Sequence, residues 1–186
     1  MNIANRLTLL RVLLIPVFIV FFYIDIPGRY LYAATVFIAA SLTDLLDGYL
    51  ARKHKIVTRF GKLVDPMADK LLVGAALILL TVQHDGLTYA IHPVITIVLI
   101  SRELIVSAFR VVAAAEGLVL AADNLGKAKT VVQIVAISAI LLNDWFFAWL
   151  HIPFGMIMIV ASVVLSVWSL IHYMYKNKGV LKDVMS

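Results

Sequence analysis

The sequence predicts an all-α integral membrane protein with six transmembrane helices and a short N-terminal interfacial helix. Hydrophobic residues make up 63% of the 186 residues, charged residues make up 15%, and the mean hydropathy is +1.00. A soluble domain is about 45–50% apolar and about 25% charged, and one small core cannot remove the excess apolar surface from water. Cysteine is absent, so there is no disulfide scaffold or thiolate site. The composition therefore excludes an ordinary cytosolic enzyme, a disordered chain and a disulfide-rich secreted domain.

Six apolar segments carry this prediction, each near the roughly 20 residues that a helix needs to cross a bilayer core. The expected spans are residues 9–24, 31–50, 63–82, 91–115, 128–148 and 152–175. The first contains Pro16, which a membrane helix tolerates as a kink, and Gly74 in the third indicates close helix packing. Before the first span, Ile3, Leu7 and Leu10 can share one face, which favours an interfacial helix over a frayed terminus.

Basic residues are concentrated at the termini and in every second connection. They are Arg6 and Arg11; Arg52, Lys53, Lys55, Arg59 and Lys62; Lys127 and Lys129; and Lys176, Lys178 and Lys182. The other three connections hold only Arg29. Positively charged loops stay in the cytoplasm, so we expect both termini to face the cytoplasm in a multi-pass protein of the cell membrane.

The remaining signals concern the outer surface and the partners. An aromatic belt is expected on the outer side, formed by Tyr23, Tyr30, Tyr32, Trp145 and Trp149. The net charge of +5 fits contact with anionic lipid headgroups or phosphate substrates. Nucleic acid is not expected as a partner, because the basic residues lie in short loops. No repeat or long linker divides residues 1–186, which indicates a single membrane domain.

Four carboxylates occupy the cytoplasmic ends of the second and third expected spans. Asp44 and Asp47 are three residues apart, and Asp65 and Asp69 are four apart, so each pair shares a helix face. A charge inside a membrane helix costs about 2.5–3.5 kcal/mol and usually marks function. Four carboxylates in one helix hairpin repel one another unless protons or a cation neutralise them, and two Mg²⁺ or Mn²⁺ ions suit such oxygen ligands. The alternative is that they are solvated helix ends or partners of nearby arginines.

The carboxylates belong to a longer pattern, D-x2-D-G-x2-A-R-x8-G-x3-D-x3-D. Its fixed positions are Asp44, Asp47, Gly48, Ala51, Arg52, Gly61, Asp65 and Asp69. This pattern resembles the signature of the CDP-alcohol phosphotransferase family and matches it at every fixed position. Family members transfer a phosphatidyl or similar group from a CDP-linked donor to an alcohol and release CMP. The six spans, with the signature on the second and third, are also similar to the family fold.

The resemblance implies roles for the signature residues. Asp44, Asp47 and Asp65 would bind the metal ions, and Asp69 would be the general base and also contact an ion. Arg52 would bind a donor phosphate, although positive-inside anchoring is the alternative.

Small and polar residues complete the implied donor site. Gly48 and Gly61 lack side chains, which allows close helix packing or close approach of the nucleotide. Asn5 and Thr8, with Arg11, resemble an N-terminal N-x-L-T-x2-R stretch that lies near the nucleotide in bacterial members using glycerophosphate. The alternative is that Asn5 and Thr8 are ordinary helix caps.

A second set of residues concerns the acceptor alcohol. An R-E…R…G-K-x-K-T-x2-Q pattern resembles that of family members that use glycerol 3-phosphate; it is formed by Arg102, Glu103, Arg110, Gly126, Lys127, Lys129, Thr130 and Gln133. Arg110, Lys127 and Lys129 are the candidates for binding the acceptor phosphate. Lys127 and Lys129 could instead be topological charges, and Arg102 and Glu103 could form a structural pair within the membrane.

These resemblances imply phosphatidyl transfer from CDP-diacylglycerol to glycerol 3-phosphate, giving phosphatidylglycerophosphate and CMP. They also imply a homodimer. The alternatives are another acceptor, such as inositol phosphate or serine, and an ion-coupled transporter. Transporters tend to place ion sites near the bilayer midplane and within internal repeats, whereas these carboxylates lie toward one edge and no repeat is visible.

Overall fold

The computed structural model is all-helical over the residues that it describes, which are 3–54, 59–115, 124–145 and 152–178. The helices are α1 (Ile3–Tyr23), α2 (Arg29–His54), α3 (Arg59–Leu79), α4 (Pro93–Ala115), α5 (Asn124–Leu141) and α6 (Phe154–Lys176). The predicted all-α class is therefore confirmed for this part of the chain. Each helix overlaps one of the six apolar segments.

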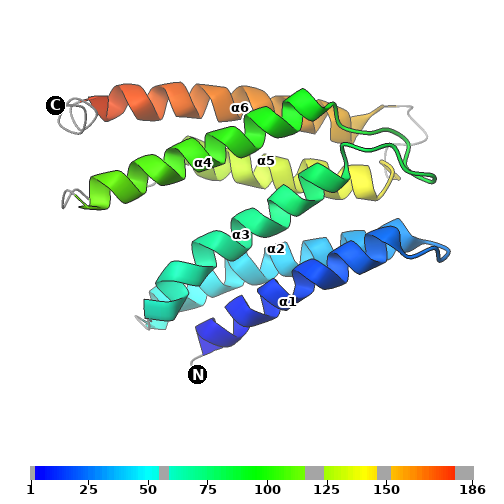
Figure 1. Cartoon of the computed structure of the whole chain (residues 1–186), viewed down its shortest axis with the longest axis horizontal. Helices are drawn as coiled ribbons and strands as arrows, with labels where there is room; N and C mark the ends of the chain where they lie inside the picture. The colour runs from blue at the N-terminus through cyan, green and yellow to red at the C-terminus, as the bar shows by residue number, and fades with distance from the viewer. Residues whose placement is uncertain (1–2, 55–58, 116–123, 146–151, 179–186) are drawn as a thin grey trace.

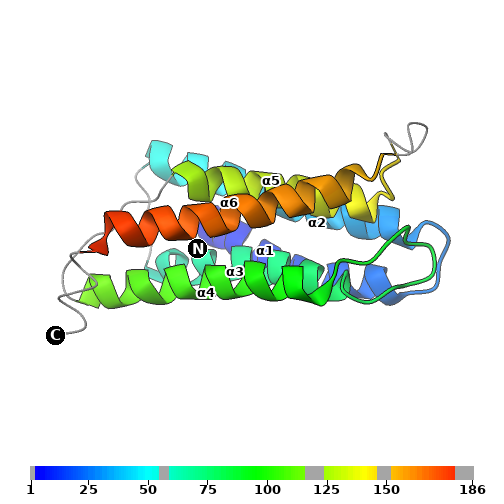
Figure 2. The ribbon, with the colours of Figure 1, turned by 90° about the horizontal axis from the view of Figure 1, so that it is seen from above.

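The helices run up and down along a common direction (Figure 1). The start of α1, the end of α6 and the ends of the helices next to the two basic connections lie at one end of the bundle, which we call the terminal end. The connections α1–α2, α3–α4 and α5–α6 lie at the opposite, far end. Figure 2 shows two layers, one with α1, α3 and α4 and the other with α2, α5 and α6. This alternation agrees with the even number of spans expected from the charges.

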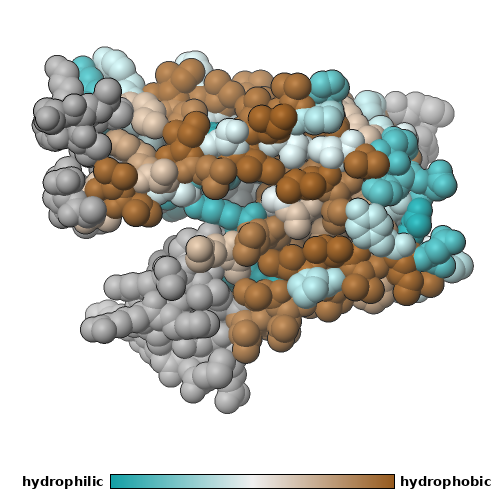
Figure 3. Space-filling view, in the orientation of Figure 1, coloured by the Kyte–Doolittle hydropathy of each residue, from teal (hydrophilic) through white to brown (hydrophobic). Residues whose placement is uncertain are grey.

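The outer surface carries many large apolar side chains. Leu104, Val111 and Val164 are each more than 60% exposed, and Figure 3 shows hydrophobic side chains over most of one face. Continuous apolar surface of this kind marks contact with a partner or a membrane. Within the described ranges, one helix is long and apolar enough to span a membrane by composition alone, namely α6, Phe154–Lys176.

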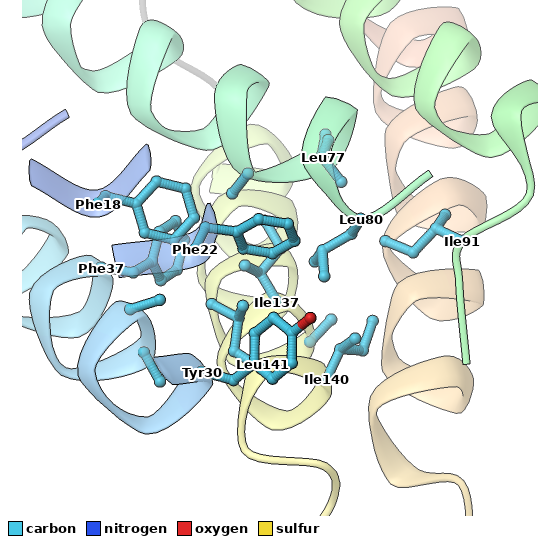
Figure 4. Close-up of a cluster of buried hydrophobic side chains, with 14 of the residues drawn as sticks. Phe18, Phe22, Tyr30, Phe37, Leu77, Leu80, Ile91, Ile137, Ile140 and Leu141 are labelled. Atoms are coloured by element: carbon cyan, nitrogen blue, oxygen red, sulfur yellow. The ribbon is translucent and has the colours of Figure 1, made fainter. Parts of the chain in front are cut away.

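A large cluster of buried hydrophobic side chains lies toward the far end of the described part of the bundle. Aromatic rings of α1 and α2 interlock there, with ring centroids 5.9 Å apart for Phe18 and Phe37 and 5.4 Å apart for Phe22 and Tyr30. Aliphatic side chains of α3 and α5 complete the cluster in Figure 4: Leu77, Leu80, Ile137, Ile140 and Leu141. Burying such side chains contributes about 1.5–3 kcal/mol each, so this cluster holds four helices together.

At the same end, hydrogen bonds join Tyr89, Asp144 and the start of α6 at Gly155 and Met156; we call this group the latch. The Asp144 carboxylate accepts a hydrogen bond from the backbone N–H of Gly155 at 2.8 Å and another from the Tyr89 hydroxyl. The Tyr89 hydroxyl in turn accepts from the Met156 N–H at 3.2 Å. Burial and the neighbouring Asp144 carboxylate raise the pKa of Tyr89 well above its usual value of 10. The Tyr89 hydroxyl therefore keeps its proton at physiological pH and remains a donor to Asp144.

The structure corrects two helix boundaries. The fifth span was expected to reach residue 148, but α5 ends at Leu141 because Asn143 and Asp144 adopt left-handed φ angles of 52° and 50°, which stop a right-handed helix. The expected separate interfacial helix is also wrong from residue 3 onward, because α1 is continuous from Ile3 to Tyr23. Neither glycine nor proline interrupts α1 before Pro16.

Two other expectations need correction. Tyr30 is buried against Phe22 and donates a hydrogen bond to the Asp85 carbonyl at 3.0 Å, so it faces the core rather than a lipid interface. The other belt residues that the structure describes, Tyr23, Tyr32 and Trp145, are exposed as expected, and Trp149 lies outside the described residues. Gly74 is not a close-packing glycine, because a Cβ added there would meet nothing within 4 Å.

The latch predicts a specific loss of stability. Asp144→Ala leaves the Gly155 N–H and the Tyr89 hydroxyl without their acceptor, so we expect the free energy of unfolding to fall by about 1–3 kcal/mol. Thermal unfolding in detergent would measure it. Asp25→Ala is the matched control, because Asp25 is a fully exposed carboxylate whose ion pair with Arg29, at 3.6 Å, lies in contact with solvent. Equal losses of stability in the two variants would contradict a stabilising role of the latch.

Candidate functional site

The signature residues lie on two helices that pack against each other. Asp44, Asp47, Gly48 and Arg52 belong to the last part of α2, and Gly61, Asp65 and Asp69 belong to the first half of α3. Both segments lie toward the terminal end (Figure 1), and α2 contacts α3. The side chains of these residues, and those of Asn5 and Thr8 in α1, lie outside the part of the chain that the structure describes. Their predicted roles therefore stay predictions.

Arg11 of α1 is the described charge nearest to the N-terminus. It is completely buried, and α1 packs against both α2 and α3. A guanidinium removed from water is costly unless anionic groups compensate it. Its burial is therefore consistent with carboxylates on the two neighbouring helices.

A second charged cluster is described in detail and is centred on Glu103 of α4. The Glu103 carboxylate accepts hydrogen bonds from the Lys129 ammonium of α5 and, at 3.2 Å, from Nη1 of Arg102. Nη2 of Arg102 donates to Oγ of Ser169 in α6 at 2.7 Å. Lys129 is 2% exposed and Arg102 is 8% exposed. The cluster thus connects α4, α5 and α6. Arg102 and Glu103 form an ion pair, as expected if they have the structural role that the sequence offered as one alternative.

Lys70 extends this cluster to α3. Its ammonium donates a hydrogen bond to Oγ of Ser107, which itself donates to the Glu103 carbonyl at 2.6 Å. Lys70 was not among the site residues predicted from the sequence. A lysine in an otherwise apolar stretch, directly after the predicted base Asp69, was the available signal, since charges within membrane helices mark function.

A groove of about 800 Å³ lies between α3, α4 and α5 and has Lys70, Glu103 and Lys129 of this cluster on its floor. Its polar lining consists of Lys70, Glu103, Ser107, Lys129, Thr130 and Gln133. Its walls are apolar and include Met67, Leu71, Gly74, Ile78, Leu99, Leu104 and Val111. Figure 3 shows a hollow between α4 and the half of the bundle that contains α3, with hydrophilic side chains inside and hydrophobic ones around it. The arrangement suits an amphiphilic ligand.

The three residues predicted to bind the acceptor phosphate do not all line the groove. Lys129 lines the groove, whereas neither Lys127 nor Arg110 is among its lining residues. Lys127 is exposed at the start of α5. Arg110 donates from Nε to the Tyr173 hydroxyl at 3.2 Å, and its guanidinium carbon lies 5.4 Å from the Tyr173 ring centroid. The described partner of Arg110 is therefore a tyrosine rather than a carboxylate.

Another cavity, of about 720 Å³, lies at the far end and is lined by Asp25, Arg29, Tyr30, Asp85, Asn143 and Trp145 among others. It contains no residue of the predicted site. Among the described side chains, no group of three or more His, Asp or Glu residues could hold a metal ion. The metal hypothesis therefore depends on the four signature carboxylates.

The charged cluster leads to a prediction about stability. Glu103→Ala would remove the carboxylate that Lys129 and Arg102 both contact, and removing one partner of a buried pair costs up to about 3–5 kcal/mol. We expect a correspondingly lower melting temperature in detergent. Asp85→Ala, which removes an exposed carboxylate at the far end, is the control and should melt like the wild type. A Glu103→Ala protein as stable as this control would show that the cluster does not hold the helices together.

Comparison with known proteins adds independent findings. The family model described as CDP-alcohol phosphatidyltransferase matches residues 1–168. A curated relative from Bacillus subtilis (strain 168), named CDP-diacylglycerol–glycerol-3-phosphate 3-phosphatidyltransferase, is 43% identical over 97% of this chain and 97% of its own length. Relatives of the same name from Haemophilus influenzae and Escherichia coli (strain K12) are 39% and 37% identical over 98% of this chain, and over 96% and 98% of their own lengths.

Proposed function

We propose a specific activity for this chain, which belongs to the CDP-alcohol phosphatidyltransferase family. It transfers the phosphatidyl group of CDP-diacylglycerol to glycerol 3-phosphate, giving phosphatidylglycerophosphate and CMP. The observation that carries this proposal is the 37–43% identity, over nearly the whole length, to relatives named for that reaction. The complete eight-residue signature in α2 and α3 supports the same chemistry.

The four signature carboxylates fit hard divalent cations. Asp44, Asp47 and Asp65 would bind the ions and Asp69 would also reach one of them, because carboxylate oxygens are the ligands that Mg²⁺ and Mn²⁺ prefer. The family resemblance implies two ions. When bound, they would neutralise the donor diphosphate and stabilise the charge that develops on the departing CMP. Arg11 is completely buried on α1, which contacts both α2 and α3, and a buried guanidinium fits an acidic neighbourhood.

The side chains of this protein would then carry out the remaining steps. Asp69 would accept the proton of the 1-hydroxyl of glycerol 3-phosphate as that oxygen attacks the phosphorus that carries diacylglycerol. The bond from this phosphorus to the CMP oxygen breaks, and CMP leaves with the electron pair. Arg52 would bind a donor phosphate. Asn5, Thr8, Gly48 and Gly61 would line the nucleotide site.

The acceptor phosphate needs cations beside this centre. Lys129, Arg110 and Lys127 are proposed for it, in line with the family pattern. The contacts of Lys129 and Arg110 support two different contributions. Lys129 is held by Glu103 and is nearly inaccessible, so it would act at short range within the groove. Arg110 is exposed and held by Tyr173, so it could meet the phosphate as it enters from water.

The membrane arrangement is also a proposal. All six helices would cross the membrane, with the terminal end and the active site at the cytoplasmic face and two chains forming a dimer. The up-and-down order of the helices and the exposed apolar side chains support the six spans. The basic residues beside the terminal end support the orientation.

Replacing the proposed base tests the mechanism. Asp69→Asn should lower the rate of CMP release by at least about 10²-fold, because general-base catalysis contributes about 10²–10⁴-fold. Mn²⁺ binding, followed by electron paramagnetic resonance, should persist because three carboxylates remain. Asp25→Asn is the control and should be fully active. An Asp69→Asn enzyme with normal turnover would remove Asp69 from the role of base.

The acceptor is tested with purified protein, CDP-diacylglycerol and a panel of alcohols. We expect CMP release with glycerol 3-phosphate and little with inositol phosphate or serine. A chelator should abolish the release, and added Mg²⁺ or Mn²⁺ should restore it, because the carboxylate site requires a divalent cation. Release with another alcohol but not with glycerol 3-phosphate would overturn the acceptor assignment. Ion flux in liposomes without any CMP release would support a transporter instead.

A further inference from the structure

We propose that the groove between α3, α4 and α5 binds one acyl chain of the diacyl donor, and that Gly74 sets the space available to this chain. This inference rests on the proposed function, because it takes the donor to be a diacylglycerol-linked nucleotide. It adds a specificity-determining residue outside the signature.

The length and shape of the groove fit a chain of one leaflet. On α3 the lining residues Met67, Leu71, Gly74 and Ile78 follow one another at intervals of three or four, so they form one helix face. From Met67 to Ile78 the wall is about 16 Å long at 1.5 Å per residue, which is roughly half of the ~30 Å hydrocarbon core. Leu99, Leu104 and Val111 of α4 form the facing wall.

The charges of the groove match an anionic lipid whose chain points toward the far end. Two lysines, Lys70 and Lys129, line it together with a single described carboxylate, that of Glu103, so the described lining carries a net positive charge. Beyond this level, toward the far end, the walls are Gly74, Ile78 and Leu99. A lipid phosphate near the lysines would therefore be followed by apolar wall. Lys70 directly follows Asp69 in α3, which connects this charged level with the proposed base.

Gly74 leaves room inside the groove. It is part of the lining, and a Cβ added to it would have no heavy atom within 4 Å. By contrast, a Cβ on Gly155 would lie 2.6 Å from Cγ1 of Ile140. An alanine at position 74 would therefore place its methyl group in the groove without meeting protein atoms of other helices, and it would remove a helix-weakening glycine. Such a residue would occupy space in the groove that a ligand needs, and it would leave the packing between the helices unchanged.

The first experiment compares donors of different chain length. CMP release with glycerol 3-phosphate is measured for dioleoyl and dibutanoyl CDP-diacylglycerol, because only the longer chains extend well past Gly74. For Gly74→Phe we expect kcat/KM with the dioleoyl donor to fall by about tenfold or more, the scale at which an apolar pocket discriminates, while the dibutanoyl donor is affected far less. Gly74→Ala should give a smaller effect in the same direction. Val164→Phe, on the exposed face of α6 and outside the groove lining, is the matched control and should not change the ratio of the two donors.

The outcomes separate this inference from the proposed function. Unchanged activity of Gly74→Phe on both donors, or equal losses on both, would overturn the acyl-chain site. A wild-type protein that releases no CMP with either donor would instead refute the proposed function. In that case a phospholipid with a photoreactive acyl chain still tests the groove. Crosslinks to residues 67–78 and 99–111 should appear in the wild type and be lost in Gly74→Phe, while crosslinks to α6 persist; equal labelling in both proteins would overturn the site.

Discussion

Charges within apolar helices must be compensated by other helices, and Glu103 is where this constraint acts most clearly. Its carboxylate contacts Lys129 of α5 and Arg102 of its own helix, and Arg102 reaches Ser169 of α6. Breaking such a pair leaves an unpaired charge in a low-dielectric region. Rotation or sliding of α4 against α5 would break the contact between Glu103 and Lys129, so the cluster defines how α4, α5 and α6 fit together. The groove floor is a consequence of that fit.

The two ends of the bundle are built differently, and this difference positions the site. Interlocked rings such as Phe18 and Phe37, with aliphatic side chains from α3 and α5, fill the far end, and the Asp144 latch closes it. Toward the terminal end α3 and α4 diverge (Figure 1), and the space between them is the groove.

The sequence predicts the helices better than it predicts what each helix face contacts. Runs of apolar residues identified six helices, and the basic residues gave the alternation of the connections. The end of α5 was missed because it depends on the left-handed conformations of Asn143 and Asp144, inside a stretch that is apolar on both sides. Tyr30 and Gly74 were misjudged because a helix that is apolar all round gives no signal for which side faces the core. Lys70 was overlooked for a related reason, since its partner Ser107 lies 37 residues away in sequence.

Under the proposed function, a hydrophilic acceptor and a lipid donor meet at two cations with different surroundings. Arg110 is exposed and paired with a neutral tyrosine, whereas Lys129 is buried and paired with a carboxylate. We expect an anion that arrives from water to be attracted more strongly by Arg110, because no described carboxylate contacts this guanidinium. Lys129 places a positive charge on the floor of an apolar groove. Its contact with Glu103 offsets much of the cost of removing the Lys129 ammonium from water. Arg110 contacts Tyr173 of α6, whereas the groove lies between α4 and the helices α3 and α5. The signature helices α2 and α3 adjoin both halves of the bundle.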